Sequence, residues 1–136
     1  MTTDLWLNLP VIDLAKSVAF YEAIGFERNP GPGNSESSAS FVVGDKRVVL
    51  MLFVHRVFAG FIGTKIADTS VGSEVLISLG ASSAAQVDEI AKRAREGGGS
   101  IYGEPGPAAG GRMYGCGLCD PDGHRWNVLF MGAPVA

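Results

Sequence analysis

The sequence has few of the residues that mark redox, metal-rich or disulfide-stabilised proteins. Its 136 residues include only two cysteines and two histidines. No apolar run reaches the roughly 18 residues that a membrane-spanning helix needs. Residues 1–4 (MTTD) lack the basic and apolar regions of a secretory signal. These absences predict a cytoplasmic protein without a membrane partner.

Charged residues are also scarce, at 18% of the chain, and the formal net charge is −3. A chain without an excess of basic residues offers no electrostatic attraction for nucleic acid. Hydrophobic residues make up 46%, which is too many for a disordered chain. The length fits one folded domain, which we place at residues 1–136.

The two cysteines, Cys116 and Cys119, form a C-x-x-C pair. One interpretation is a redox or metal pair, since this spacing at a helix start can lower a thiol pKa. The segment 113–119 contains two glycines and has the pattern of a strand, and residues three apart in a strand point to opposite faces. We therefore favour two separate thiols and keep the redox pair as the alternative.

The first half begins with an amphipathic strand and a helix. The leucines at positions 5, 7 and 9 alternate with Trp6, Asn8 and a proline, which predicts a strand whose leucine face meets a helix. Trp6 and Asn8 then face the other side of the sheet. Asp13 is a predicted N-cap for a helix over 13–24, and Gly25 is its stop signal.

The rest of the first half predicts a short strand at 26–28, a mobile surface loop at 29–35 and a hairpin of strands at 38–43 and 47–54. The stretch 55–71 contains Phe58, Phe61 and Ile62, spaced for one side of a short helix or of a structured loop. We expect these side chains in the core or at a dimer interface, with a lid over a ligand as the alternative.

The second half repeats this order of elements. It predicts a strand at 73–79, then a helix opened by Ser83 and Gln86 at capping-box spacing and ended by the glycines 97–99. A short strand at 100–102, a Gly/Pro loop at 103–111 and strands at 112–119 and 125–131 follow, with a turn at 120–123 between the last two.

The repeat predicts an α+β fold of two βαβββ modules, about 1–68 and 72–136, forming a curved mixed sheet around a cavity. Such concave interiors commonly hold small molecules. A ferredoxin-like α+β domain is the alternative, although it needs fewer strands than the sequence predicts.

Two motifs carry a resemblance to a known family. Residues 8–26 (NLPVIDLAKSVAFYEAIGF) resemble the opening module of vicinal-oxygen-chelate proteins, and residues 120–126 (DPDGHRW) resemble their closing turn and strand. The chain is thus similar to the glyoxalase/bleomycin resistance protein/dioxygenase superfamily over nearly its whole length. The resemblance implies the two-module fold, a small-molecule ligand and a homodimer.

Enzymes of this family bind a divalent metal through inward-facing His and Glu. The resemblance places these ligand positions on Trp6, on Met51 or Leu50, on Glu74 and on Asn127. Only Glu74 is a good ligand for a divalent ion, and His55 and His124 lie at a strand end and in a turn. We expect no cofactor and no tightly bound metal, and a divalent metal held by unidentified ligands stays as the alternative.

Strand alternation and the resemblance together predict the cavity lining. The predicted inner face comprises Trp6, Asn8, Met51, Phe53, Glu74, Leu76, Asn127 and Leu129, with Tyr114 and Cys116 beside them. The predicted ligand-binding residues are Trp6, Asn8, Met51, Phe53, Glu74, Arg112, Tyr114 and Asn127. Arg112, beside the Gly/Pro loop, is expected either to pair with Glu74 or with an anionic ligand, or to be an exposed, solubilising side chain.

Three functions remain open at this point. The first is a metal-independent protein that binds a partly apolar or aromatic ligand. The second is an enzyme that uses Glu74, the one candidate catalytic residue, as a general base whose pKa is raised by burial. The third is a metal-dependent lyase or dioxygenase that acts on a small oxygenated metabolite. We favour them in that order.

Overall fold

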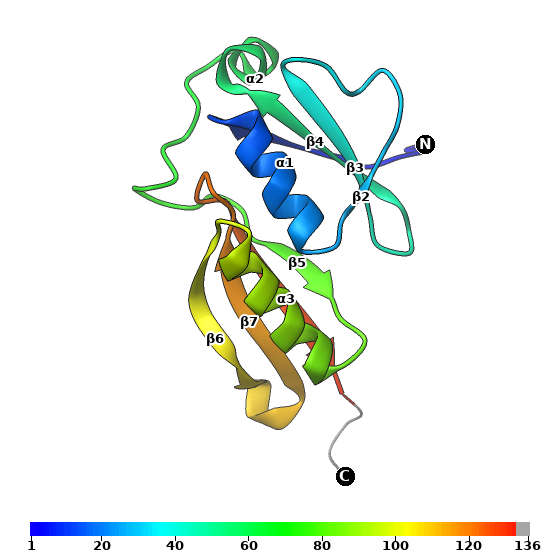
Figure 1. Ribbon diagram of the computed structural model, residues 1–136, viewed down its shortest axis with the longest axis vertical. Coiled ribbons are helices and arrows are strands. Elements are labelled where there is room, and N and C mark those ends of the chain that lie inside the picture. The colour runs from blue at the N-terminus through cyan, green and yellow to red at the C-terminus, as the bar shows by residue number, and fades with distance from the viewer. Residues whose placement is uncertain (133–136) are drawn as a thin grey trace. The chain divides into compact units, whose positions relative to one another are not determined.

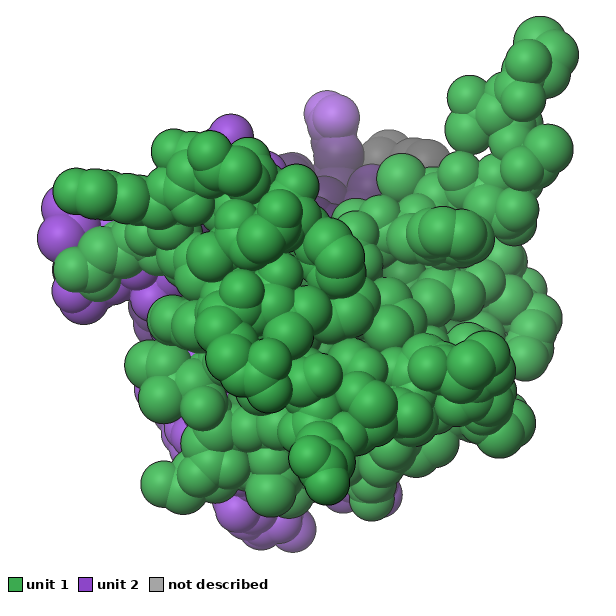
Figure 2. All heavy atoms as spheres, turned by 90° about the horizontal axis from the view of Figure 1, so that it is seen from above, with its two compact units in different colours: residues 1–68 green, residues 69–136 purple. Residues whose placement is uncertain are grey.

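The computed structural model describes residues 1–132 and divides the chain into two compact units, 1–68 and 69–136. Figure 1 shows the elements of each unit, and Figure 2 colours the atoms of the two units separately. Over the described residues each unit contains one four-stranded mixed sheet, with strand orders β1-β4-β3-β2 and β5-β8-β7-β6.

The first unit has a parallel strand pair and an antiparallel hairpin in one sheet. β1 pairs in parallel with β4, while β3 pairs antiparallel with β4 and β2. The elements are β1 (Trp6–Val11), α1 (Leu14–Ala23), β2 (Glu27–Arg28), β3 (Ser38–Val43), β4 (Val48–Val54) and α2 (His55–Ile62).

Helix α1 and the sheet of this unit bury a common apolar core. Its fully buried side chains include Val11, Phe20, Tyr21, Phe41, Leu50 and Leu52. Leu9 is also buried, as the predicted leucine face requires, but Leu5 lies before β1 and is exposed. The aromatic ring of Tyr21 stacks on Phe26 at 5.4 Å, which connects the helix to the segment that follows it.

The ends of α1 follow the local sequence signals. The Oδ1 atom of Asp13 accepts a hydrogen bond from the backbone N–H of Lys16 at 3.1 Å. At the other end Gly25 has a φ of 97°, a left-handed conformation that a side chain disfavours. The predicted helix at 13–24 is confirmed, with its first and last residues serving as caps.

The loop at 29–35 has more internal structure than the predicted mobile loop. The amide nitrogen of Asn34 donates to the backbone oxygens of Asn29 and Gly31, and its Oδ1 accepts from Arg28 and from the backbone N–H of Ser40. These bonds hold the loop against β3. The predicted loop is present, and the sequence did not indicate these bonds, because turn-rich composition shows where the chain bends but not whether the bends hydrogen-bond to a neighbouring strand.

The second unit repeats the arrangement of the first. Its elements are β5 (Ile77–Gly80), α3 (Ala84–Glu96), β6 (Ser100–Ala108), a short 3-10 turn (Ala109–Gly111), β7 (Met113–Cys119) and β8 (Arg125–Met131). Helix α3 lies along one face of this sheet (Figure 1). Its buried residues Val87, Ala91 and Ala94 share the core with Leu118, Trp126 and Val128.

Two strand boundaries in this unit differ from the sequence prediction. β5 begins at Ile77 rather than at position 73, so Glu74 and Leu76 lie ahead of the strand and are exposed. β6 runs to Ala108, through most of the predicted Gly/Pro loop. Prolines are tolerated there because β6 is an edge strand, where a missing N–H costs no bond to a second neighbour.

The start of α3 also differs in detail. The Ser83 hydroxyl accepts from the backbone N–H of Gln86 at 3.0 Å, as predicted. The Gln86 side chain, however, accepts from the backbone N–H of Ser82 rather than of Ser83. The reciprocal bond of the capping box is thus displaced by one residue.

The shared order of elements and of strands confirms an α+β fold of two βαβββ modules. Helix α2 is an addition to the first module, after its last strand. Within residues 1–132, every helix is too short or too polar to cross a lipid bilayer.

Candidate functional site: an aromatic pocket in the first unit

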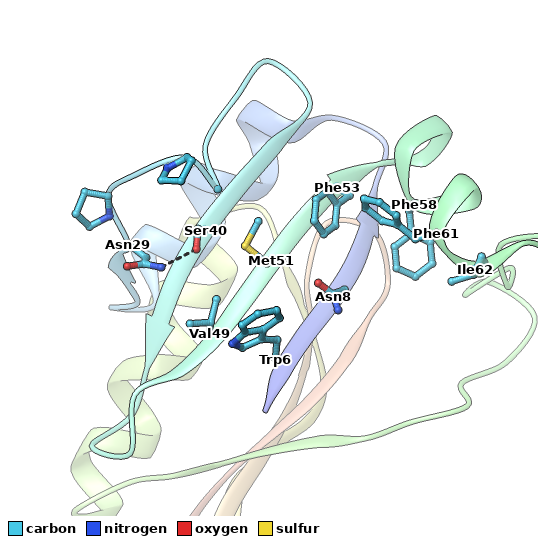
Figure 3. A pocket seen from close by; sticks show the side chains of 13 residues that line it. Trp6, Asn8, Asn29, Ser40, Val49, Met51, Phe53, Phe58, Phe61 and Ile62 are labelled. Carbon is cyan, nitrogen blue, oxygen red and sulfur yellow. Dashed lines mark hydrogen bonds between the residues drawn. The ribbon is translucent and has the colours of Figure 1, made fainter. Parts of the chain in front are cut away.

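The first unit carries a pocket of about 860 Å³. Such a volume is within the range of sites that bind small molecules. Figure 3 shows its lining, which comes from β1, β3, β4, α2 and the loop before β3. The 13 lining residues are Trp6, Asn8, Asn29, Pro30, Pro32, Gly33, Ser40, Val49, Met51, Phe53, Phe58, Phe61 and Ile62.

Strand register explains why the sheet residues of the pocket share one face. Trp6 lies opposite Val49, and Asn8 lies opposite Met51, in the parallel pair of β1 and β4. On the other side of β4, Met51 lies opposite Ser40 of β3. Because side chains alternate along a strand, the intervening residues form the core under α1. The pocket therefore occupies the face of this sheet that α1 leaves uncovered.

Helix α2 supplies an aromatic wall at one end of this face. The rings of Phe53 and Phe61 meet edge to face, with centroids 5.0 Å apart and an interplanar angle of 77°. Phe58 and Ile62 line the same wall. Although Phe61 contacts Phe53, its side chain is 68% exposed. Since α2 has no buried residue, these side chains do not belong to the core, and the dimer interface and the lid over a ligand stay predictions.

The opposite wall, formed by β3 and the loop before it, carries the polar groups of Asn29 and Ser40. The amide Nδ2 of Asn29 donates to the Ser40 hydroxyl oxygen at 3.0 Å, and Ser40 is only 2% exposed. Gly33 packs so closely that a Cβ atom there would lie 3.1 Å from the Ser40 Cβ and 3.4 Å from the Met51 Cε. This wall thus combines a fixed hydrogen-bonding group with a closely packed backbone.

Four of the predicted ligand-binding residues lie together in this pocket: Trp6, Asn8, Met51 and Phe53. Sequence reasoning missed Val49 and Ser40, although strand alternation through Met51 and the hairpin could have found both. It also missed the loop residues Asn29, Pro30, Pro32 and Gly33, for which the sequence gives no signal, because their position depends on bonds to β3.

The other four predicted residues belong to the second unit and do not line this pocket. Glu74 lies in an exposed bend before β5. Arg112 is exposed at the end of the 3-10 turn, where its carbonyl accepts from the backbone N–H of Gly132. Within residues 1–132 neither side chain forms an ion pair. The anticipated pairing of Arg112 with Glu74 is therefore not formed.

Tyr114 and Cys116 were predicted on the inner face, but they lie on the face of β7 that α3 covers. The Tyr114 hydroxyl donates to Oδ1 of Asp88 on α3 at 2.7 Å, and this bond raises the pKa of Tyr114. Burial raises the pKa of the Cys116 thiol, which lies opposite Val128 in the core. Alternation correctly grouped the two residues but could not decide which face the helix covers.

The cysteines behave as separate groups. Cys116 is buried, whereas Cys119 is half-buried three residues later, and both are free thiols. Odd spacing along β7 places them on opposite faces of the strand.

Asn127 lies on the open face of the second sheet. It pairs with Ser78 of β5 and Gly117 of β7 in the strand register. Its Oδ1 atom is buried and has no hydrogen-bond partner within the described chain. On the same open face, the Arg125 guanidinium lies 4.3 Å from the centre of the Tyr102 ring, a cation–π contact.

The donor set does not fit a divalent metal. Glu74 is the only carboxylate among the four positions on which the sequence resemblance places metal ligands, and it is exposed ahead of β5. Among residues 1–132, no three His, Cys, Asp or Glu side chains cluster as metal ligands would. The indole of Trp6 and the thioether of Met51 are poor ligands for hard or borderline ions, and the carbonyl oxygen of Asn127 with one carboxylate would make only a weak site.

Comparisons with known proteins agree with this fold. The structure resembles that of a hypothetical protein from S. aureus, with 32% identity, a TM-score of 0.82 and coverage of 96% of this chain and 95% of the other. A glyoxalase-related enzyme from Fulvimarina pelagi has 17% identity, a TM-score of 0.80 and coverage of 96% and 88%.

A more distant similarity is to a mutant of the fosfomycin resistance protein from Listeria monocytogenes, solved with Mn(II) and a dihydroxypropylphosphonic acid. It has 18% identity, a TM-score of 0.69 and coverage of 97% and 94%. No curated protein matches the sequence. The sequence model of the Glyoxalase/Bleomycin resistance protein/Dioxygenase superfamily matches residues 5–128, which is most of the chain. The chain therefore belongs to the glyoxalase/bleomycin resistance protein/dioxygenase superfamily.

Proposed function

We propose that this protein binds a partly apolar or aromatic small molecule in the pocket of the first unit, without a metal ion. The observation that carries the proposal is the composition of the lining. Aromatic side chains from β1, β4 and α2 surround a few polar groups, and none of the 13 lining residues has a titratable side chain. This combination is typical of sites that hold a ligand by burial and orient it with a few hydrogen bonds.

The same lining argues for binding rather than catalysis at this site. General acid–base catalysis needs a group that can exchange a proton near neutral pH. The one hydroxyl in the lining, on Ser40, accepts from the Asn29 amide, and none of the other 12 lining residues is a base that could activate it as a nucleophile. Glu74, the candidate general base, is not part of the lining.

Aromatic burial supplies enough free energy for useful affinity. A ligand ring system that removes about 200 Å² of apolar surface from water gains about 5 kcal/mol, before the cost of immobilisation. Hydrogen bonds to the Asn8 amide and the Ser40 hydroxyl add to this. After the cost of immobilisation we therefore expect dissociation constants of about 0.1 to 1 mM.

Fluorescence titration against a panel of small aromatic compounds tests the proposal. Trp6 lines the pocket and is 64% exposed, whereas Trp126 is 1% exposed in the core of the second unit and supplies a constant background. We expect saturable changes in emission for some compounds, confirmed by calorimetry. Glu74→Gln should leave the affinity unchanged, and Trp6→Ala should weaken it.

Either of two results would contradict the proposal. One is the absence of saturable binding by any compound up to about 1 mM. A dissociation constant of that size corresponds to a binding free energy of only about 4 kcal/mol. The other is binding that survives Trp6→Ala but is lost in Glu74→Gln, which would place the ligand elsewhere and favour the Glu-based enzyme.

Homodimerisation and a cytoplasmic location remain proposals that rest on the resemblance and on the sequence. Sedimentation equilibrium of the whole chain tests the first. A monomer at all concentrations would remove Phe61 and Ile62 as candidate interface residues.

A further inference from the structure

We infer that the pocket selects uncharged, planar aromatic compounds that carry a carbonyl group, such as aromatic carboxamides. This inference rests on the proposed function and narrows it to a ligand class. Three features of the lining carry it: the absence of a charged side chain, a buried hydroxyl with an unused proton, and an amide whose donor and acceptor are both free.

The lining gives no compensation for a charged ligand. It contains no Asp, Glu, His, Lys or Arg side chain among the residues that the structure describes. An ion that leaves water for a largely apolar site loses its hydration, and without a counter-charge the loss is not recovered. A neutral molecule has no such penalty.

The Ser40 hydroxyl is a preformed donor in the polar wall. Its oxygen accepts from Asn29 Nδ2 at 3.0 Å, and no residue among 1–132 accepts its proton. At 2% exposure this hydroxyl is poorly placed to reach bulk water. An unsatisfied buried donor is costly, and a ligand acceptor removes that cost. A carbonyl oxygen is the neutral group that fits this requirement.

The Asn8 amide provides the complementary pair of groups. Asn8 lies on β1 in register with Met51, between the Trp6 ring and the aromatic side chains of α2 (Figure 3). Its side chain forms no hydrogen bond within the described chain. In the strand register β4 lies between Asn8 and Ser40, with Met51 opposite both, so the Asn8 amide is placed for a second polar group of a ligand rather than for the carbonyl that accepts from Ser40.

The shape of the walls favours a flat ring over a bulky one. The Phe53 ring meets that of Phe61 from α2, with Phe58 beside them, and the Trp6 indole lies by Val49 at the other end of the open face (Figure 3). On the opposite side the close approach of Gly33 to Ser40 and Met51 leaves no room for even one added methyl group without movement. Planar rings stack on such aromatic walls at little entropic cost.

The test is calorimetric titration of the whole chain with four matched probes. They are 1-naphthamide, naphthalene, 1-naphthoate and 1-naphthylmethylammonium, which share one ring system and differ in polar group and charge. We expect 1-naphthamide to bind about tenfold more tightly than either charged probe. It should also bind about fivefold more tightly than naphthalene, because it gains the hydrogen bonds.

Substitutions in the lining identify the residues that determine the preference among the probes. Ser40→Ala should weaken the binding of 1-naphthamide about fivefold and leave the binding of naphthalene unchanged, since only the amide accepts a hydrogen bond from the hydroxyl. A general disturbance of the pocket would weaken both probes equally. Asn8→Asp should make 1-naphthylmethylammonium bind about fivefold more tightly by adding a counter-charge. Ser78→Ala, on the second unit, is the matched control and should leave the affinity for every probe unchanged.

The outcomes separate this inference from the proposed function. If all four probes bind equally and Trp6→Ala weakens them, the pocket binds aromatic compounds but the ligand class is wrong. The ligand class is also wrong if Ser40→Ala leaves the preference for the amide intact. If no probe binds up to about 1 mM, both the inference and the proposed function are overturned.

Discussion

Two glycines of the first unit differ in the space that surrounds them. Gly33 lies against the Ser40 and Met51 side chains, whereas Gly60 in α2 has no atom within 4 Å of the position a Cβ would occupy. Neither residue has a positive φ, so backbone strain does not enter. The same substitution at the two positions should therefore have opposite effects.

Gly33→Ala is expected to lower the free energy of unfolding by about 1 kcal/mol, because overpacking forces the loop away from β3. Gly60→Ala should raise it by about 0.5–1 kcal/mol, because alanine favours the helix. Urea denaturation of both variants measures the changes. If Gly60→Ala destabilised the protein as much as Gly33→Ala, the space around each glycine would not be what determines the effect.

The Tyr114 side chain gives a second prediction for a single residue, which concerns how stability depends on pH. Its hydrogen bond to Asp88 raises its pKa above the ordinary value of 10.0. The folded state therefore holds the proton more tightly than the unfolded state. The stabilisation is complete below the unfolded pKa and is lost as the pH rises through the higher folded pKa.

Tyr114→Phe should consequently destabilise the protein near neutral pH, and the difference from the wild type should shrink above about pH 10. Unfolding curves of both proteins across this pH range check the prediction. A difference that stays constant with pH would mean that the hydroxyl contributes through packing and not through the bond to Asp88.

At the scale of elements, α2 differs from the other two helices. It has no buried residue, and its first turn lacks a side-chain cap, whereas α1 and α3 have both. Local opening is easiest where few apolar contacts must break. An element of this kind suits a wall that must admit a ligand.

We expect the backbone amides of α2 to exchange with solvent faster than those of α1 and α3 in the free protein. A bound aromatic ligand should slow exchange in α2 selectively, because it adds contacts to Phe58 and Phe61. Hydrogen–deuterium exchange followed by mass spectrometry measures this. Equal protection of α2 and α3 without ligand would contradict the prediction.

At the scale of the whole molecule, both modules use the same strand order with different side chains on their open faces. The first module places its 13-residue pocket there. The second module places Asn127, Tyr102 and Arg125 on its open face. One architecture thus supports two different surfaces, and function follows from the side chains rather than from the fold.

The metal content of the whole protein is a further prediction at this scale. Since the donors at the family's metal positions do not fit a divalent ion, protein purified without chelator should carry metal well below one equivalent. EDTA should leave the unfolding temperature unchanged, because only a ligand that binds the folded state stabilises it. Elemental analysis and thermal unfolding decide this, and stoichiometric metal with a lower unfolding temperature after EDTA would contradict it.

Local features of this protein were predictable from its sequence. The cap of α1 at Asp13 and that of α3 at Ser83 involve partners only three residues away. The alternation in β1 and β4 also depends only on local geometry, because successive side chains of a strand point to opposite faces. It separates the core residues from Trp6, Asn8, Met51 and Phe53. These short-range rules were enough for the order of elements, the two-module fold and four pocket residues.

The tertiary structure decided what depends on distant contacts. Asn29 and Ser40 are 11 residues apart, and their bond forms only when the loop folds onto β3. Alternation paired Tyr114 with Cys116, but the packing of α3 determined that their face is the covered one. The sequence thus determined which residues share a face, because that rule is local. Only packing determined which face is open, because it depends on where a helix comes to rest.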